Sequence, residues 1–268
     1  MNKPIIILLT LLSFLSSSCG NKKGPVLYYD MENGAAEKPV YAEDIFSDPA
    51  SKQLAKAIVK SDYDQIKEMS KDKVLLNKQG EHGVTHLWIA VSRQDIKSVK
   101  MLLENGADPN LKMTWVKPPL ITALSNEGSP GKKVDGIFRL LLDHGADPNV
   151  KSVSQDTKVP AIFYANYSRE KIEMLLKKGA DIDAVNQNGS TALLANAGPS
   201  KARHAIHYLE LGANLKARGI EGRTMVDQLE MHIKINKDNQ KEFEPIFKWL
   251  KDHGYKLSDL RGENIEGE

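Results

Sequence analysis

The chain has 268 residues, a formal net charge of +2 at pH 7 and a hydrophobic content of 41%. Basic and acidic residues are interspersed, so no basic stripe is available to neutralise phosphates, and nucleic acid is not an expected partner. Cys19 is the only cysteine, so disulfides do not stabilise the body of the protein.

Residues 1–18 have the layout of a secretory signal peptide. Lys3 precedes an apolar stretch over residues 4–15, and three serines follow at positions 16–18. A short basic start, an apolar centre and small residues before the cleavage point are typical of exported proteins. The apolar stretch is too short to span a bilayer comfortably, so we expect this segment to be removed during export.

Cys19 directly follows the small residues and resembles the lipobox cysteine of bacterial lipoproteins, which is acylated and becomes the mature N-terminus. The resemblance is incomplete, because serine occupies position 16 where that family prefers leucine. Glycine rather than aspartate follows the cysteine, and by the same resemblance this favours a periplasm-facing outer-membrane lipoprotein. The alternative is an ordinary secretory signal with an incidental cysteine. Met31 also offers a second start, which would give a cytoplasmic fraction.

The next two segments lead into the body of the protein. Residues 19–48 are rich in Gly, Pro, Lys, Glu and Asp, a composition that predicts a flexible tether. Residues 49–79 show helical spacing of apolar residues and predict a degenerate N-terminal capping repeat. Asp62 is the expected N-cap of a helix there.

A short sequence motif is repeated in the central part of the chain. The pattern Leu-Leu-x-x-Gly-Ala-Asp ends at Asp108, Asp147 and Asp181, and a weaker copy ends at Asn214. The four glycines are 39, 34 and 33 residues apart, and a period near 33 indicates stacked supersecondary units. The apolar residues before each glycine fall at i, i+3 and i+4 on one helix face. A single unit cannot bury that face alone, so neighbouring units must stack.

A second phrase lies upstream of these copies. It reads Gly83-Val84-Thr85-His86-Leu87-Trp88-Ile89-Ala90 in the first unit and Gly189-Ser190-Thr191-Ala192-Leu193-Leu194-Ala195 in the last. Together the phrases resemble the ankyrin repeat, whose signature is a Thr-Pro-Leu-His-x-Ala turn that opens the first of two helices. The resemblance covers residues 80–216. It implies an all-α solenoid of about five to six stacked helix-turn-helix units with short turn or hairpin tips.

The ends of the solenoid and the departures from the family pattern give further expectations. Residues 217–262 predict a C-terminal capping repeat, and residues 263–268 predict a frayed tail.

Trp88 stands where the family usually has histidine, so we expect the usual hydrogen bonds from that histidine to the turn to be lost. An insertion around Asn126–Gly136 predicts a loop between the two helices of its unit.

The sequence offers little for catalysis. It contains no Gly-rich phosphate loop, no Gly-x-Ser-x-Gly elbow and no Cys-x-x-Cys knuckle, so we expect no enzymatic activity, no cofactor and no metal. His204 and His207 lie three residues apart on a predicted helix but lack a phased third zinc ligand. His144 and His253 each precede a helix-ending glycine, where a cation is favourable. The recurring aspartates are interpreted as turn formers rather than catalytic carboxylates.

Binding is the expected role, because ankyrin-like stacks usually contact partners through turn tips and the exposed side of their first helices. Mapping the repeat onto this sequence places five candidate partner-binding residues there: Ile89, Arg93, Trp115, Phe163 and Tyr167. Buried aromatics are common anchors at interfaces. The alternative for the three aromatic residues is that they fill gaps between imperfect units.

The chain also resembles ankyrin-type lipoproteins of Gram-negative bacteria. Several of these resemble immunity proteins encoded beside antibacterial phospholipase effectors of the type VI secretion system. The resemblance implies a protein that is monomeric when free, is held at the membrane by its lipid, and binds and neutralises a secreted lipase toxin. The alternative is a general periplasmic scaffold or envelope-stress protein.

Overall fold

The computed structural model describes residues 26–32, 35–114, 116–126, 136–154, 157–166, 168–199 and 201–261. The predicted signal peptide, Cys19, Trp115, Tyr167 and the tail at 263–268 lie outside the described residues. Within the described ranges, no helix is long and apolar enough to cross a membrane.

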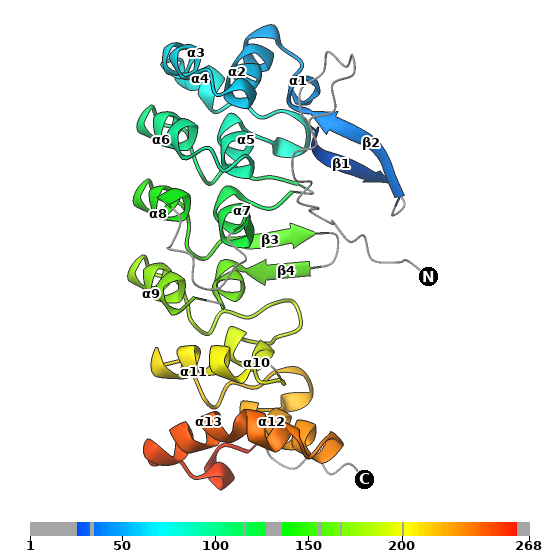
Figure 1. The fold of residues 1–268 in the computed structure, drawn as a ribbon, viewed down its shortest axis with the longest axis vertical. Coiled ribbons are helices and arrows are strands. Elements are labelled where there is room, and N and C mark those ends of the chain that lie inside the picture. The colour runs from blue at the N-terminus through cyan, green and yellow to red at the C-terminus, as the bar shows by residue number, and fades with distance from the viewer. Residues whose placement is uncertain are drawn as a thin grey trace.

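Helices dominate the described chain and stack into an elongated column (Figure 1). The first helices of successive units form an inner row: α2 (Pro49–Lys60), α5 (His86–Ser92), α7 (Pro119–Asn126), the 3-10 helix η2 (Ala161–Ala165), α10 (Ala192–Ala195) and α12 (Met225–Ile235). The second helices form an outer row: α3 (Tyr63–Met69), α6 (Ile96–Glu104), α8 (Gly136–Asp143), α9 (Arg169–Lys177), α11 (Ala202–Glu210) and α13 (Asn239–Asp252). The predicted all-α solenoid of five to six two-helix units is confirmed.

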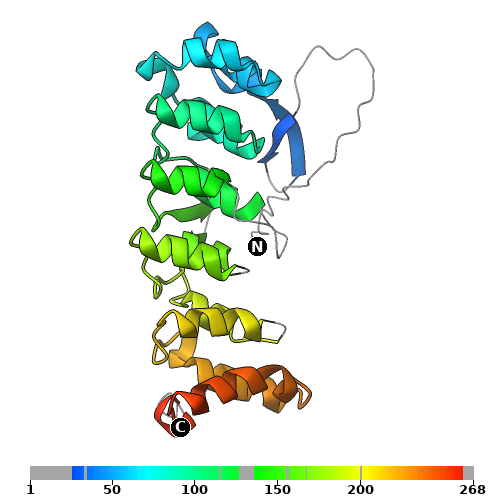
Figure 2. The same ribbon diagram turned by 60° about the vertical axis from the view of Figure 1, so that its left-hand side comes forward.

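The outer row is easiest to follow in Figure 2, where its helices lie one above another along the column. Short helical turns complete the set: α1 (Ala42–Ile45), α4 (Lys73–Leu76), η1 (Glu81–Gly83), η3 (Ile220–Gly222) and η4 (Leu257–Asp259). Each inner helix therefore has inner-row neighbours along the column and outer-row helices behind it.

Two antiparallel hairpins project from the column on the side away from the outer row (Figure 1). One consists of β1 (Val26–Glu32) and β2 (Ala35–Tyr41), and the other of β3 (Lys151–Ser154) and β4 (Thr157–Pro160). The second hairpin extends the tip between α8 and η2. Its backbone is braced by the next tip, because the Lys158 N–H donates to Gln187 Oε1 at 3.0 Å.

The first hairpin corrects the expectation of a flexible tether over residues 19–48. Residues 26–32 pair with residues 35–41, and Ile45 and Phe46 are buried in the core. The prediction rested on the overall composition of the segment and overlooked a hairpin motif. The sequence has Asn33-Gly34 between the two strands. Asn-Gly between β-prone runs strongly favours a two-residue hairpin.

The helix ends follow from the repeated phrases. Thr85 caps α5, because its Oγ1 accepts a hydrogen bond from the Trp88 N–H at 3.1 Å. At the other end of a unit, Gly106 has φ +96° after α6, a left-handed conformation that glycine adopts without strain. The Ala107 N–H then donates to Leu102 O at 3.0 Å, as in a Schellman motif.

The repeated aspartates and two of the histidines have the local roles that the sequence predicts. Asp108, Asp147 and Asp181 each accept a hydrogen bond from the backbone N–H two residues later, at 2.8, 2.8 and 2.9 Å. His144 and His253 donate through Nδ1 to the carbonyl four residues earlier, both at 2.8 Å. These contacts stabilise turns and helix ends.

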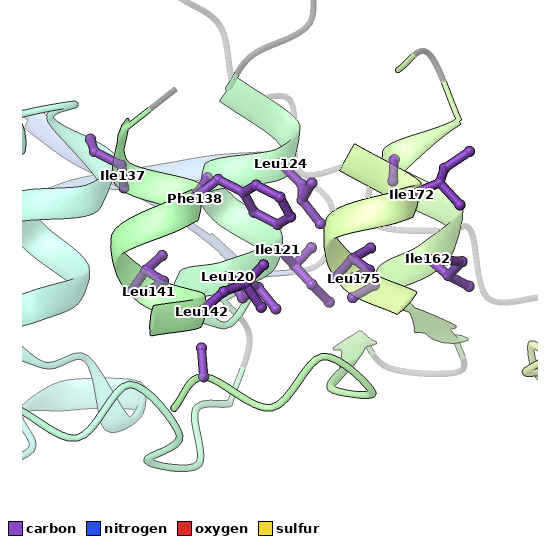
Figure 3. Packing of buried hydrophobic residues seen from close by; sticks show 14 of the residues in the cluster. Leu120, Ile121, Leu124, Ile137, Phe138, Leu141, Leu142, Ile162, Ile172 and Leu175 are labelled. Atoms are coloured by element: carbon purple, nitrogen blue, oxygen red, sulfur yellow. The ribbon is translucent and has the colours of Figure 1, made fainter. Parts of the chain in front are cut away.

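A continuous apolar core lies between the two rows of helices. Figure 3 shows Phe138, Leu141 and Leu142 of α8 beside Leu120 and Ile121 of α7. All five side chains are buried. The i, i+3, i+4 apolar face that the sequence predicts for α8 therefore packs against the inner row, and stacking of further units extends the core along the column.

Candidate protein-binding surface

Ile89 is expected on the exposed side of its helix, and the structure shows that this expectation is wrong. Its side chain has 0% exposure, and its neighbours Ala90 and Val91 are also buried. The helix α5 has seven residues and lies between α2 and α7, with α6 against it. An inner helix this short and this surrounded has almost no free circumference, so its middle residues contact only the protein itself.

Arg93 lies immediately after α5, at the end of this inner helix, and is half-buried. Its Nε atom is buried and has no hydrogen-bond partner among the described residues. Burial lowers the pKa of the guanidinium, while the charge of Asp95 acts in the opposite direction. The structure thus places this predicted residue where a charged group is partly removed from water.

Phe163 is partly buried and packs against the core from η2. Its partial burial is consistent with filling a gap between units. Because the side chain is not fully buried, a contact with a partner is also compatible with the structure. The other two aromatic candidates, Trp115 and Tyr167, lie outside the described residues.

Lys117, which precedes α7, takes part in several hydrogen bonds that the sequence did not predict. Its carbonyl oxygen accepts one from Trp88 Nε1 at 2.9 Å and one from Thr122 Oγ1 at 2.9 Å. Replacement of the family's histidine by Trp88 thus does not remove every hydrogen bond from this position. The indole N–H, standing in place of the histidine, reaches the turn of the following unit.

The ammonium group of Lys117 is held on the surface of the next inner helices. Its Nζ donates to Ser125 Oγ at 3.1 Å and lies 4.8 Å from the ring centroid of Tyr164. Burial lowers the pKa of this ammonium. Sequence reasoning missed this cluster because its members come from three successive repeat units and no local motif connects them.

A second feature is a cleft in the C-terminal part of the column, between the last two tips and α12. It is lined by Ser190, Ile220, Glu221, Arg223, Gln228 and Met231. Ile220 is an exposed apolar residue. Arg223 forms an ion pair with Glu221 at 2.5 Å and donates to Met231 Sδ at 3.2 Å, so the charges of this cleft are already compensated internally.

The histidines on α11 lie close together but do not make a recognisable metal site. The ring centroids of His204 and His207 are 6.5 Å apart in an edge-on arrangement, and burial lowers both pKa values. Among the described residues, no group of three or more His, Cys, Asp or Glu side chains is arranged to hold a metal ion. The surface is thus made of partly buried cations, aromatic rings and turn tips.

The family model "Ankyrin repeat" matches residues 82–113, which span η1, α5, α6 and the turn that follows. These are the elements that carry the buried Trp88 and the half-buried Arg93. The protein is built of ankyrin repeats. This fold is a protein-interaction scaffold and is generally non-enzymatic.

Solved structures agree with this assignment. An ankyrin-repeat domain of Acinetobacter baumannii is 26% identical with a TM-score of 0.59, and the match covers 76% of this chain and 98% of that one. A chain in the complex of the Bdellovibrio bacteriovorus predatory endopeptidase Bd0816 with immunity protein Bd3460 is 25% identical with a TM-score of 0.58. That match covers 71% of this chain and 97% of the other. The ankyrin-repeat protein EF0377 is 24% identical with a TM-score of 0.58. No curated protein matches the sequence.

Proposed function

We propose that this ankyrin-repeat protein is an immunity protein that binds and neutralises a secreted antibacterial hydrolase. The observation that carries the proposal is the similarity to the chain from the immunity complex, which is matched over 97% of its length. The similarity covers 71% of this chain, so it extends over several repeat units and not one unit alone. A stack of this kind is generally a protein-interaction scaffold, and it can inhibit an enzyme by covering it.

The mode of action follows from the shape of the column. A solenoid presents an extended surface of turn tips and inner-helix ends, and contacts between adjacent units keep that surface preorganised. Inhibition by such a surface requires only that it cover the entrance to the active site of the hydrolase. The half-buried cationic groups at Arg93 and Lys117 would supply specific polar contacts on this surface.

The expected location supports the same role. Acylation at Cys19 would place the inhibitor on the periplasmic face of the outer membrane, next to the lipids that a phospholipase attacks. The sequence resemblance favours a lipase as the target, whereas the structural neighbour Bd3460 is complexed with an endopeptidase. We propose the lipase, and the experiment below separates the two target classes.

The test uses a candidate hydrolase, taken from the neighbouring gene if that gene encodes a secreted hydrolase. Sensitive cells export that hydrolase to the periplasm with or without this protein, and survival is measured. The purified pair is then assayed for complex formation, for phospholipid hydrolysis and for cleavage of peptidoglycan peptides. We expect rescue of the cells, a stable complex and stoichiometric inhibition of phospholipid hydrolysis.

The controls identify what a failure would mean. A catalytically inactive hydrolase should still bind the protein without killing cells. Inhibition of peptide cleavage with no phospholipase activity would replace the lipase by a peptidase and leave the immunity role intact. If the purified chain neither binds nor slows the hydrolase, the immunity proposal is wrong and a general periplasmic scaffold becomes the better description.

A further inference from the structure

Residues of three consecutive repeat units contact Lys117, and two of these units hold its side chain. Trp88 from the preceding unit fixes its backbone carbonyl, Ser125 from its own unit accepts from its ammonium, and the Tyr164 ring from the following unit faces the ammonium. A free lysine side chain has many rotamers, and ordering it is unfavourable. A lysine ordered before binding is therefore suited to recognition, because less freedom is lost when a partner arrives.

The ammonium retains hydrogen-bonding capacity for a ligand. It has three N–H donors, and in the described part of the chain Ser125 Oγ is its one oxygen acceptor. No carboxylate within the described ranges pairs with it, and the Tyr164 ring covers one side without accepting all of its donors. A cation that is partly removed from water loses hydrogen bonds to the solvent. An anion that accepts hydrogen bonds from it replaces them and is therefore bound favourably.

Arg93, one unit earlier, is also a partly buried cation, and the charge of Asp95 only partly offsets the effect of its burial. It forms no ion pair with the described residues, and its buried Nε lacks an acceptor there. Arg93 follows the last residue of α5, and Ser125 lies in the last turn of α7. The inner helices α5 and α7 are packed neighbours, and packed helices are about 8–10 Å apart. Lys117 precedes α7, but its side chain runs along that helix to Ser125, so its ammonium and Arg93 both lie towards the C-terminal ends of adjacent inner helices.

We propose that Lys117 and Arg93 form a recognition site for two carboxylates carried by an acidic segment of the protein partner. The carboxylates would be spaced by about one repeat unit, on the order of 10 Å. The cation–aromatic arrangement of Lys117 and Tyr164 orients one donor group, and the guanidinium of Arg93 matches a second carboxylate through its planar fork. The inference rests on the proposed function only in naming the secreted hydrolase as the protein that carries this segment.

The site can be tested without the hydrolase by using an acetylated and amidated hexaglutamate peptide as the probe. Six extended residues span roughly 20 Å, enough to reach both cations. Binding of the fluorescently labelled peptide is measured for the full chain and for Lys117→Met, which keeps the apolar stem and removes the charge. We expect a loss of about tenfold or more in affinity, the usual scale for one charge-assisted hydrogen bond.

The matched control is Lys97→Met on the outer row. The Lys97 ammonium lies 3.9 Å from the centroid of the Tyr63 ring, so it has the same cation–aromatic contact but is exposed on another face. We expect its affinity for the probe to change less than about twofold. Lys117→Arg should retain part of the binding, hexaglutamine should not bind, and thermal melts should show that all variants are folded.

Several results would overturn the inference. They are no binding of hexaglutamate to the native chain, equal losses for the Lys97 and Lys117 variants, or equal binding of hexaglutamine. A second arm uses the hydrolase itself. If it binds the native protein and Lys117→Met binds equally well, the hydrolase does not use this site, although the immunity role stands. If the native protein does not bind the hydrolase but discriminates hexaglutamate as expected, the immunity role fails and the carboxylate site stands.

Discussion

Asn110 joins two consecutive repeat units by holding Asp147: its Oδ1 accepts a hydrogen bond of 2.8 Å from the Asp147 backbone N–H. Its Nδ2 also donates to Gly145 O at 2.8 Å. Asn77 and Asn149 make the same pair of bonds to the units that follow them. The result is a ladder of side-chain amides that runs along the turns and links each unit to the next.

The ladder is incomplete at Asp183. Its carboxylate accepts from the Asn214 N–H at 2.9 Å, but it has no N–H to donate to Gly212 O, which corresponds to Gly145. We predict that Asp183→Asn supplies this donor and stabilises the protein by about 1 kcal/mol. A thermal melt should show a rise of roughly 2–4 °C for a chain of this size.

The reverse change provides the control for the ladder. Asn149→Asp removes the donor to Gly179 O and keeps the acceptor for the Asp181 N–H, so it should lower the melting temperature by a similar amount. A melting temperature that is unchanged or lowered in Asp183→Asn would show that the amide donor contributes nothing at this position.

The second prediction concerns the packing between rows. Leu142 is 3% exposed in the core between α7 and α8 (Figure 3). Leu142→Ala should lower the free energy of unfolding by about 2–5 kcal/mol, because it removes apolar contacts and leaves a cavity. Urea unfolding measures the change. Val74→Ala is the control, since Val74 is 82% exposed and should change stability by less than about 0.5 kcal/mol.

The third prediction is a loss of stability in mild acid that depends on His86. Its ring is buried and stacks on Phe46 at 4.2 Å, and its Nε2 donates to Ser51 O at 3.1 Å. Burial lowers the pKa of His86 in the folded state, whereas the unfolded chain has a histidine pKa of about 6.5. The unfolded state therefore binds more protons below pH 6.5, and stability should fall as the pH decreases from 7.5 to 5.

Urea unfolding at several pH values would test the role of His86. His86→Gln keeps a donor for Ser51 O but does not titrate in this range, so its stability should fall less steeply with acid. Part of the slope should remain, because burial also lowers the pKa values of His204 and His207. Identical slopes for the two proteins would exclude His86 as a source of the acid sensitivity.

The fourth prediction concerns the membrane anchor. Cys19→Ser should release the protein from the membrane fraction, because a lipid chain would be the main apolar anchor after removal of residues 1–18. Fractionation and immunoblotting measure the shift, and the size of the band excludes an uncleaved precursor. A serine variant that is correctly cleaved and still sediments with membranes would rule out acylation as the anchor.

The fifth prediction separates the aromatic candidates by stability and binding. Phe163→Ala should lower both the melting temperature and the affinity for the hydrolase, because the side chain is partly buried against the core. Trp115→Ala and Tyr167→Ala should weaken binding by roughly thirtyfold if these residues are hot spots, with little change in the melting temperature. Full protection of cells by all three variants, expressed normally, would place the binding surface elsewhere.

The sequence by itself determined the local features of the repeat. Helix caps and helix-ending glycines act within a few residues, so Thr85, Gly106 and Asp108 could be assigned from spacing alone. The buried face of α8 could also be predicted, because helical geometry places residues at i, i+3 and i+4 on one side. The stacking of units then followed from the period.

Only the tertiary structure decided which residues of the inner row are accessible. Ile89 is buried because α2, α6 and α7 surround α5, and the pattern of one helix does not contain that information. The contacts of Lys117 with Trp88 and Tyr164 join residues 29 positions apart and residues on either side of a unit boundary. Such contacts depend on the rotation and spacing of neighbouring units, which fix the direction of each side chain after the repeats have stacked.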